Sequence, residues 1–292
     1  MRESMQLDIF ADSRDVMLRS DVVAALRVRD GLLGRRTLDA FAAEYPDDSL
    51  LAPLTALLDA LLSTPPACLD HQAAANTCQR MEAMVIPMAV RVFGERDASD
   101  WLAPLWRSLA HAAAFLPYNH QIPGAYAAPM LLRAREWTMA EDAITKIASW
   151  RRVPMPLAWM AEARFALGGI EAAWPLLIEL SWLNASNFGE LARRLDSRVL
   201  DGLLRNFQSS IAAEGDTELA WFAAWLLIAE PATVAILRQT QQGRDSLPER
   251  SARLIADLLG LERQGRHAEV VELRKKLRDL HAELFALYML SR

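Results

Sequence analysis

Residues 166 to 180, ALGGIEAAWPLLIEL, decide how the fold of this sequence is interpreted. Apolar residues at helical spacing lie on both sides of Gly168 and Gly169, and glycine supplies the left-handed backbone that ends many helices. The stretch therefore predicts the end of one helix, a sharp bend and the start of a second helix. Because one pair of helices cannot cover its own apolar faces, such pairs are expected to recur.

A second stretch repeats this arrangement upstream. Residues 134 to 148, AREWTMAEDAITKIA, align with the first stretch at an offset of about 30 residues, which sets Ala143 against Ala173. A small residue at this position lets two antiparallel helices approach each other closely. The alignment therefore predicts two consecutive helix pairs of the same kind.

The pattern occurs again near both ends of the chain. Residues 262 to 276, ERQGRHAEVVELRKK, place Gly265 at the turn and Ala268 at the small position, and residues 26 to 48 form a weaker copy. Stacking of such pairs makes the apolar core continuous from one pair to the next. The repeats thus predict an array of stacked helix pairs.

The rest of the chain shows helical spacing of apolar residues, and no stretch alternates apolar and polar residues as a half-buried strand does. About thirteen or fourteen helices joined by short turns would fill the chain, so we predict an all-α fold. The segment GERDASD, residues 94 to 100, is the best place for a domain boundary. We predict an N-terminal helical segment with a degenerate repeat over residues 1–97 and a repeat array over residues 98–292, with one continuous domain, 1–292, as the alternative.

The charge of the chain argues against nucleic acid as a partner. The 292 residues carry 32 basic and 37 acidic side chains, a net charge of −5, whereas phosphate binding needs a surplus of Lys and Arg on one face. The charge is unevenly distributed, because residues 1–100 contain 10 basic and 16 acidic residues. This acidic third of the chain favours a basic partner.

The sequence predicts a cytoplasmic protein. Its two cysteines, Cys68 and Cys78, form no disulfide framework, and residues 1–15 lack the apolar core of a signal peptide. The longest apolar run, residues 219–229, is shorter than the roughly 20 residues that a membrane span needs, so we predict no membrane association. Only three of the 32 basic residues are lysines, which indicates a GC-rich bacterial genome.

The repeats resemble the tetratricopeptide repeat family, with the best match over residues 156–185 and further matches over residues 124–153 and 251–284. Residues near the family's characteristic positions are Trp159, Ala163, Leu167, Gly168, Ala173, Leu177 and Leu180. The resemblance covers about a third of the chain and implies a right-handed α-solenoid of antiparallel helix pairs. The usual period of the family is about 34 residues, which is longer than the offset found here. The Asn and basic residues with which some members clamp a peptide's C-terminal carboxylate have no matching set, so that activity is not carried over.

Candidate partner-binding residues gather in the middle of the chain. The segment YNHQIPGAY, residues 118–126, would line a groove as a polar loop held between rigid helices. Its alternative interpretation is a structured connector in which Pro123 and Gly124 start the next helix. The predicted partner-binding residues are Tyr118, Asn119, His120, Gln121, Tyr126, Arg133, Trp137, Arg151, Arg152 and Trp159.

The tryptophans and arginines of this region admit two interpretations as well. Seven of the nine tryptophans lie between Trp101 and Trp182, and Trp dominates many interfaces, but large residues on apolar stripes also fill the space between helix pairs. The arginines could recognise a carboxylate or phosphate group, or they could belong to a solvated face.

We predict no metal site and no cofactor. Cys68, His71 and Cys78 resemble a ligand set, but on one helix the two cysteines would lie about 15 Å apart, whereas zinc ligands converge within about 2.3 Å of the ion. The sequence contains no phosphate-binding glycine loop, no nucleophile elbow and no His-Glu-x-x-His motif. We therefore expect that the protein is not an enzyme.

The sequence favours a non-catalytic protein-interaction module that binds a peptide or helix of a partner protein on its concave face. One alternative is an all-α enzyme or small-ligand-binding protein, which would have an enclosed pocket lined by titratable groups. A second alternative is a structural subunit of a larger assembly, with a large exposed apolar patch and a tendency to form a homodimer.

Overall fold

The computed structural model describes residues 3–63, 70–210, 216–243 and 245–292. The regular structure of these residues is entirely helical, which confirms the all-α prediction. The chain divides into a first unit, Met1–Glu136, and a second unit, Trp137–Arg292. The predicted boundary after residue 97 falls within the first turn of a helix of the first unit, Glu95–Ala112.

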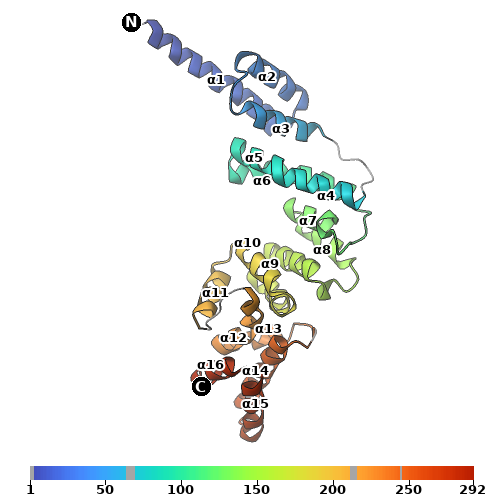
Figure 1. Cartoon of the computed structure of the whole chain (residues 1–292), viewed down its shortest axis with the longest axis vertical. Helices are drawn as coiled ribbons and strands as arrows, with labels where there is room; N and C mark the ends of the chain where they lie inside the picture. Colours follow the sequence, from blue (N-terminus) through green and yellow to red (C-terminus); the bar gives the residue numbers. More distant parts are fainter. Residues whose placement is uncertain (1–2, 64–69, 211–215, 244) are drawn as a thin grey trace. The chain divides into compact units, whose positions relative to one another are not determined.

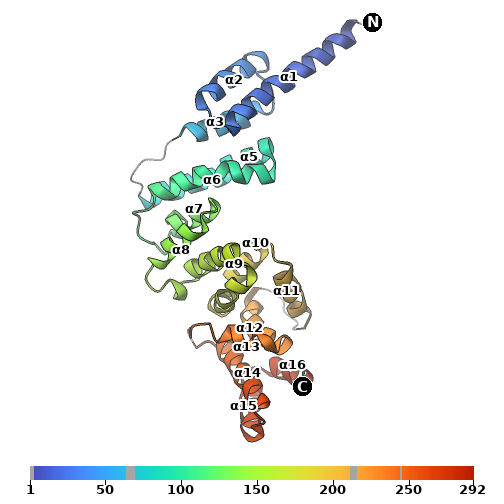
Figure 2. The same ribbon diagram turned by 180° about the vertical axis from the view of Figure 1, so that it is seen from behind.

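In the first unit α1, α2 and α3 lie side by side (Figure 1 and Figure 2). In chain order the helices of this unit are α1 (Glu3–Arg27), α2 (Gly31–Glu44), α3 (Leu51–Leu62), α4 (His71–Arg80), α5 (Ile86–Phe93), α6 (Glu95–Ala112) and α7 (Ala127–Arg133). A π-helical turn, η1 (Met81–Val85), joins α4 to α5, and a 3₁₀ turn, η2 (Pro123–Ala125), precedes α7. Further packing joins α3 to α5, α5 to α6, and α6 to α7.

Hydrogen bonds connect the C-terminal end of α1 and the turn after it to α6. The indole nitrogen of Trp101 donates a hydrogen bond to the carbonyl oxygen of Leu26 at 2.8 Å. Arg29 donates to the carbonyl oxygen of Trp101 at 2.7 Å, and its guanidinium lies 5.3 Å from the centre of the indole ring. Trp101 and Leu26 are both buried, so these contacts stabilise the core of the first unit.

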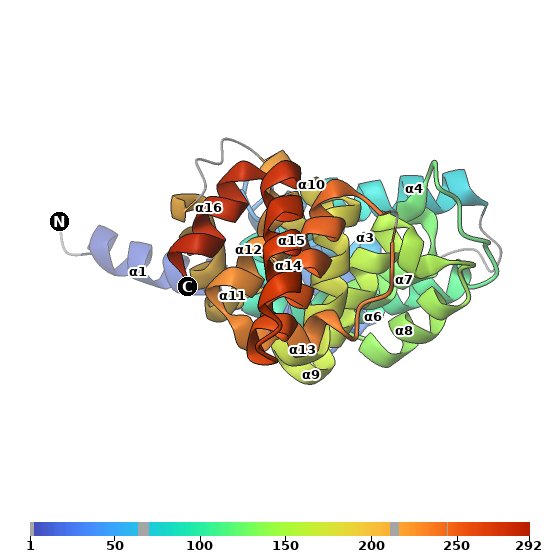
Figure 3. The same cartoon turned by 90° about the horizontal axis from the view of Figure 1, so that it is seen from below.

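The second unit packs around an aromatic cluster formed by Phe188, Phe207, Phe222 and Trp225. Its helices are α8 (Trp137–Thr145), α9 (Pro154–Leu183), α10 (Ala185–Arg194), α11 (Arg198–Ser210), α12 (Phe222–Ala229), α13 (Val234–Leu237), α14 (Leu247–Arg263), α15 (His267–Leu280) and α16 (Ala282–Leu290). The 3₁₀ turns η3 (Trp150–Arg152), η4 (Asp216–Trp221) and η5 (Pro231–Thr233) separate some of them. Helix α14 pairs with α15, and α16 returns to pack on α12 (Figure 3).

The bend predicted from the two glycines is confirmed. Helix α9 breaks at Gly168 (φ −136°, ψ 15°) and Gly169 (φ 68°, ψ −166°), so residues 154–183 form two helical segments. The positive φ at Gly169 suits glycine, which has no Cβ to clash with the backbone. A Cβ at Gly168 would lie 2.8 Å from the Cβ of Ala172, so this position also needs glycine.

Left-handed residues mark the other predicted turns. They are Arg29 before α2, Arg135 before α8 and Gly265 before α15. The step from Arg135 to Gly169 is longer than the offset obtained from sequence alignment, and it equals the usual family period of about 34 residues. The difference arises because a non-glycine residue, Arg135, takes the left-handed conformation, and no glycine in the sequence marks that turn.

The small positions of the repeats differ in burial. Ala143 and Ala173 are buried, as close approach of two helices requires. Ala268 is exposed, so the third copy does not use its small residue for a helix contact.

The first segment of α9 runs parallel to α10. The Asn187 side-chain amide donates to the sulfur of Met155 at 3.4 Å, and Arg194 donates to Glu162 at 2.5 Å. Both pairs are separated by 32 residues, and a constant separation means that the two helices advance in the same direction.

No single helix among the described residues is both long and apolar enough to cross a bilayer. The segments Glu218–Ala229 and Pro231–Leu237 satisfy the criteria of length and composition only as a pair, and they are bent by 108° at the break between them.

A candidate partner-binding groove

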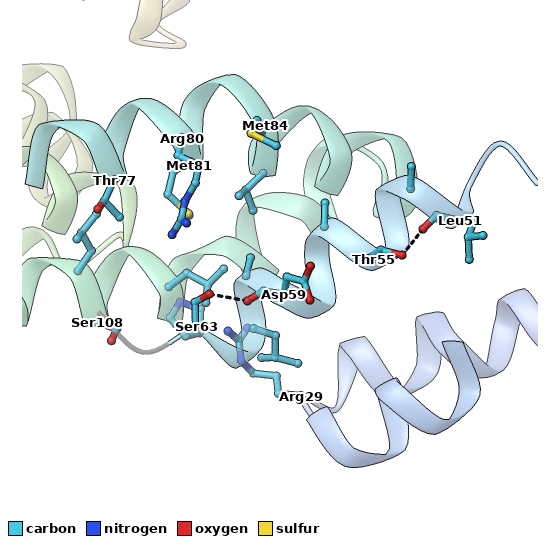
Figure 4. A pocket seen from close by; sticks show the side chains of 18 of the residues that line it. Arg29, Leu51, Thr55, Asp59, Ser63, Thr77, Arg80, Met81, Met84 and Ser108 are labelled. Carbon is cyan, nitrogen blue, oxygen red and sulfur yellow. Dashed lines mark hydrogen bonds between the residues drawn. The ribbon is translucent and has the colours of Figure 1, made fainter. Parts of the chain in front are cut away.

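A groove of about 970 Å³ lies in the first unit (Figure 4). Its walls are α3 with the turn that precedes it, the end of α4 with η1, and the middle of α6. Part of this lining is open to solvent, since Met84 is 52% exposed.

The wall formed by α3 has two stripes at helical spacing. Ala52, Ala56 and Ala60 recur every fourth residue and line the groove, and a polar stripe of Thr55, Asp59 and Ser63 runs beside them. The apolar side of α3 faces the core, where Leu54, Leu57 and Leu58 are fully buried. The alanines of α3 thus line the groove together with Leu51 and Leu61, whereas its fully buried leucines face the core.

The opposite wall depends on the π-helical turn. The amide of Ile86 donates to the carbonyl of Met81, five residues back, directly before Pro87. Proline has no N–H and disfavours a regular helix before it, which explains why the helical hydrogen bonding shifts here. Met81, Met84 and Val85 thereby line the groove, and methionine adapts readily to differently shaped apolar surfaces.

Charged side chains lie at the edges of the groove. Asp48 accepts from Arg19 at 2.5 Å, and Asp59 pairs with Arg35 at 3.3 Å while 60% of its side chain stays exposed. Asp47 is exposed in the same turn as Asp48. Arg80 is the exposed charge of the facing wall, so the groove has an acidic edge and a basic one.

Arg29 closes the lower side of the groove in Figure 4. Its hydrogen bond and its contact with Trp101 hold it in the first unit. Burial lowers the pKa of the Arg29 guanidinium from its ordinary value.

The residues of the segment predicted as a polar binding loop contact one another. Tyr118 packs edge-on against His120 and Tyr126, with ring centres 4.9 and 5.8 Å apart. The carboxamide oxygen of Asn119 accepts a hydrogen bond from the backbone amide of Gln121 at 2.9 Å. Burial raises the pKa of Tyr118 and of Tyr126. The 3₁₀ turn η2 starts at residue 123, in keeping with the alternative interpretation.

The remaining predicted residues are distributed over both units. In the first unit, Arg133 pairs with Glu82 at 2.5 Å and lies 4.8 Å from the ring centre of Trp106. In the second unit, Trp137 is half-buried, Arg152 is exposed and Trp159 is only 4% exposed.

Arg151 is held within the second unit by Glu179, with a further hydrogen bond to the carbonyl of Gln239 at 3.2 Å. The structure brings Tyr118, His120 and Tyr126 together, and it places none of the ten predicted residues in the lining of the groove. Their role in partner binding stays a prediction.

One feature of the sequence indicates the groove, although the repeat pattern does not include it. An alanine at every fourth position of α3, on the side away from its leucines, indicates a helix face that another element can approach closely. Without knowledge of its neighbours, however, that stripe could equally have faced another helix of the same chain.

Two members of the rejected metal set have other contacts. His71 donates to the carbonyl of Pro117 at 2.8 Å, and the Cys78 thiol contacts the carbonyl of Gly124 at 3.6 Å. Burial raises the pKa of the Cys78 thiol to about 11. Cys68 lies outside the described residues, and among the described ones no group of three His, Cys, Asp or Glu side chains could hold a metal ion.

The second unit contains two buried glutamates that hold the segment between α13 and α14. Glu179 accepts from the amide of Gln241 at 2.7 Å, and Glu249 accepts from the amide of Gly243 at 2.8 Å. Arg253 donates to Glu249 and to the carbonyl of Gln241. Burial raises the pKa of Glu179, against the opposing effect of its hydrogen bonds with Arg151 and Gln241. Each carboxylate is satisfied by partners within the unit, as a structural role requires.

Comparison of the chain with protein-family models, with curated proteins and with solved structures gives no match.

Proposed function

We propose that the protein is a non-catalytic protein-interaction module whose first unit binds a segment of a partner protein in the groove. One observation carries this proposal: a groove of about 970 Å³ is lined by an alanine stripe on one helix and by methionines on another. Small and adaptable apolar side chains framed by charged edges are the features with which helical proteins receive a partner segment.

The chemistry of the lining supports binding rather than catalysis. Among the described residues that line the groove there is no histidine and no cysteine. Asp48 and Asp59 are engaged by arginines at the edge, where water reaches Asp59. General acid–base catalysis relies on groups positioned next to a bound substrate, whereas these two carboxylates are already paired with arginines.

The proposal includes a tetratricopeptide-like α-solenoid in a bacterial cytoplasm. The step between the turns at Arg135 and Gly169 equals the usual family period of about 34 residues, which supports this part of the proposal. The parallel course of α10 and the first segment of α9 supports it as well, since first helices of successive repeats stack in the same direction.

A second candidate function, as a structural subunit, is favoured by a separate observation. Leu32 is 87% exposed at the start of α2, and Val28 is 70% exposed in the preceding turn. Large apolar side chains exposed so near each other in the sequence are a feature that a neighbouring subunit could cover.

Site-specific photo-crosslinking in the cells that naturally produce the protein would test the proposed function. A photoreactive phenylalanine analogue replaces Ala56 in the groove, and the same analogue at the exposed Ala43 on α2 serves as the control. We expect a discrete protein adduct from position 56 and not from position 43. Equal adduct patterns from both positions, or no adduct from position 56, would contradict the proposal.

A further inference from the structure

We propose that the segment received by the groove is an amphipathic α-helix of about three turns whose basic residues face α3. This inference rests on the proposed function, because it names the partner of the same groove. Three properties of the lining support it: the hydrogen bonding of its hydroxyl groups, the length of its α3 wall and the sign of its charged edges.

The hydroxyl groups of the lining favour a helical partner over an extended one. Thr55 donates to the carbonyl of Leu51 at 2.8 Å, and Ser63 donates to the carbonyl of Asp59 at 2.7 Å, as the dashed lines in Figure 4 show. An extended peptide needs partners for its own N–H and C=O groups, whereas a helix satisfies them internally. Because the donor hydrogens of α3 are already used within their own helix, a helical partner loses less on entering the groove.

The length of the α3 wall sets the size of the partner. From Ala52 to Ser63 the lining covers eleven residue steps of α3, about 16 Å at 1.5 Å per residue, which matches three turns of a second helix. With alanines on one wall, two helix axes can approach to about 8 Å. Met81 and Met84 on the facing wall can adjust to the larger apolar side chains of the partner.

The charged edges set the orientation of the partner. Asp47 and Asp59 lie at the α3 edge, and they belong to the part of the chain in which acidic residues outnumber basic ones by 16 to 10. Asp59 pairs with Arg35 but stays 60% exposed. A Lys or Arg of the partner opposite Asp47 and Asp59 would therefore add an ion pair at Asp47 and add to or replace the one at Asp59, each worth about two- to fivefold in affinity. Arg80 on the facing wall favours an acidic residue on the other flank of the helix.

A displayed library of 15-residue helical peptides selected against the full chain would test the inference. We expect the selected peptides to have apolar residues at i, i+3 or i+4, and i+7, with Lys or Arg enriched on one flank. Bound peptides should show a helical circular dichroism spectrum. Substitution of Ala56→Trp, which fills the groove, should abolish their binding, whereas Ala43→Trp on the exposed side of α2 should not.

Charge reversal isolates the part of the inference that concerns the basic flank. Asp47→Lys combined with Asp59→Lys should weaken the selected peptides about tenfold, from two rim pairs together. The matched control, Asp21→Lys with Asp39→Lys, makes the same change in net charge at two exposed positions outside the groove and should change affinity less than twofold.

The outcomes separate the inference from the proposed function. One outcome would overturn the inference and leave the proposed function standing. In that outcome Ala56→Trp prevents binding of the selected peptides, but the peptides lack a basic flank and bind the charge-reversed variant as well as the wild type. Selected peptides that bind in extended form would have the same meaning. A dimer of the protein that Ala56→Trp dissociates would identify a second copy as the occupant and overturn the inference. Peptides unaffected by Ala56→Trp, or failure to select any, would count against both.

Discussion

Arg151 and Glu179 form a bidentate ion pair inside the second unit: Nε and Nη2 of the arginine each lie 2.6 Å from a different carboxylate oxygen. Only 5% of the Glu179 side chain is exposed. The arginine that the sequence suggested as a contact for a partner thus neutralises a carboxylate buried in the second unit.

Replacing Arg151 should therefore destabilise the protein without involving any partner. Arg151→Ala leaves the carboxylate of Glu179 buried without its main counter-charge, and we expect a loss of about 3 kcal/mol in the free energy of unfolding, measured by urea denaturation. The neighbouring Arg152 is exposed, so Arg152→Ala should change stability by less than about 0.5 kcal/mol. Equal effects of the two substitutions would show that the ion pair contributes little.

Two Gly→Ala substitutions in the second unit, one at the bend of α9 and one inside α11, should have opposite effects on stability. At Gly169, φ is 68°, so Gly169→Ala should destabilise the second unit by about 1–2 kcal/mol. At Gly202, inside α11, a Cβ would meet no atom within 4 Å, and Gly202→Ala should stabilise by about 0.5–1 kcal/mol. Thermal melting of the two variants gives the comparison. A Gly169→Ala variant as stable as the wild type would show that the bend does not need a left-handed residue.

The buried thiol of Cys78 predicts slow alkylation. Its pKa of about 11 lies two units above the ordinary value of 9.0, so at pH 8 its thiolate population is about a hundredfold lower than that of an unperturbed thiol. In a Cys68→Ser background, labelling of Cys78 by iodoacetamide should be slower by about that factor than labelling of the urea-unfolded chain.

The same thiol affects stability at alkaline pH. Since the pKa is raised in the folded state, the folded protein holds the proton between about pH 9 and pH 11 while the unfolded chain releases it. The contribution is complete below pH 9 and is lost as the pH rises towards 11. The stability difference between wild type and Cys78→Ala should shrink over that interval, and a constant difference would contradict the raised pKa.

The tryptophan that joins α1 to α6 predicts a measurable cost for the loss of one hydrogen bond. Trp101→Phe removes the donor to the Leu26 carbonyl and part of a buried ring, and we expect a destabilisation of about 2 kcal/mol. Trp150→Phe, at a half-buried position, is the matched control and should cost less than about 1 kcal/mol. Chemical denaturation followed by circular dichroism measures both.

Local signals in the sequence predicted part of the fold. The pair Gly168–Gly169 marked a bend, because only glycine takes that backbone conformation without strain, and the glycine at 265 marked another. The sequence predicted a helix pair over residues 134–148 but did not mark the turn at Arg135, because nothing in the type of that residue indicates φ of 58°. The repeat offset obtained from the sequence was therefore too short.

The candidate site could be predicted less well, because it depends on which residues meet. Arg151 and Glu179 are 28 residues apart, and no periodicity in the sequence pairs them. The alanines of α3 form a groove only because Met81 and Met84 of η1 line its other wall, and η1 comes after α4 in the sequence. The predicted partner-binding residues are mostly aromatic and basic, whereas alanines of α3 and methionines of η1 line the groove.

The π-helical turn at Met81–Val85 makes the lining of the groove sensitive to chain length. Each residue of an α-helix turns the following side chains by about 100°, so the wider turn sets the phase between α4 and α5. Loss of one residue here, such as Ala83, would keep the helix and almost all of its composition but rotate the side chains on one side of the turn relative to those on the other. Insertions and deletions of single residues at this turn, more than substitutions, are thus the changes through which a related protein could acquire a groove of different selectivity.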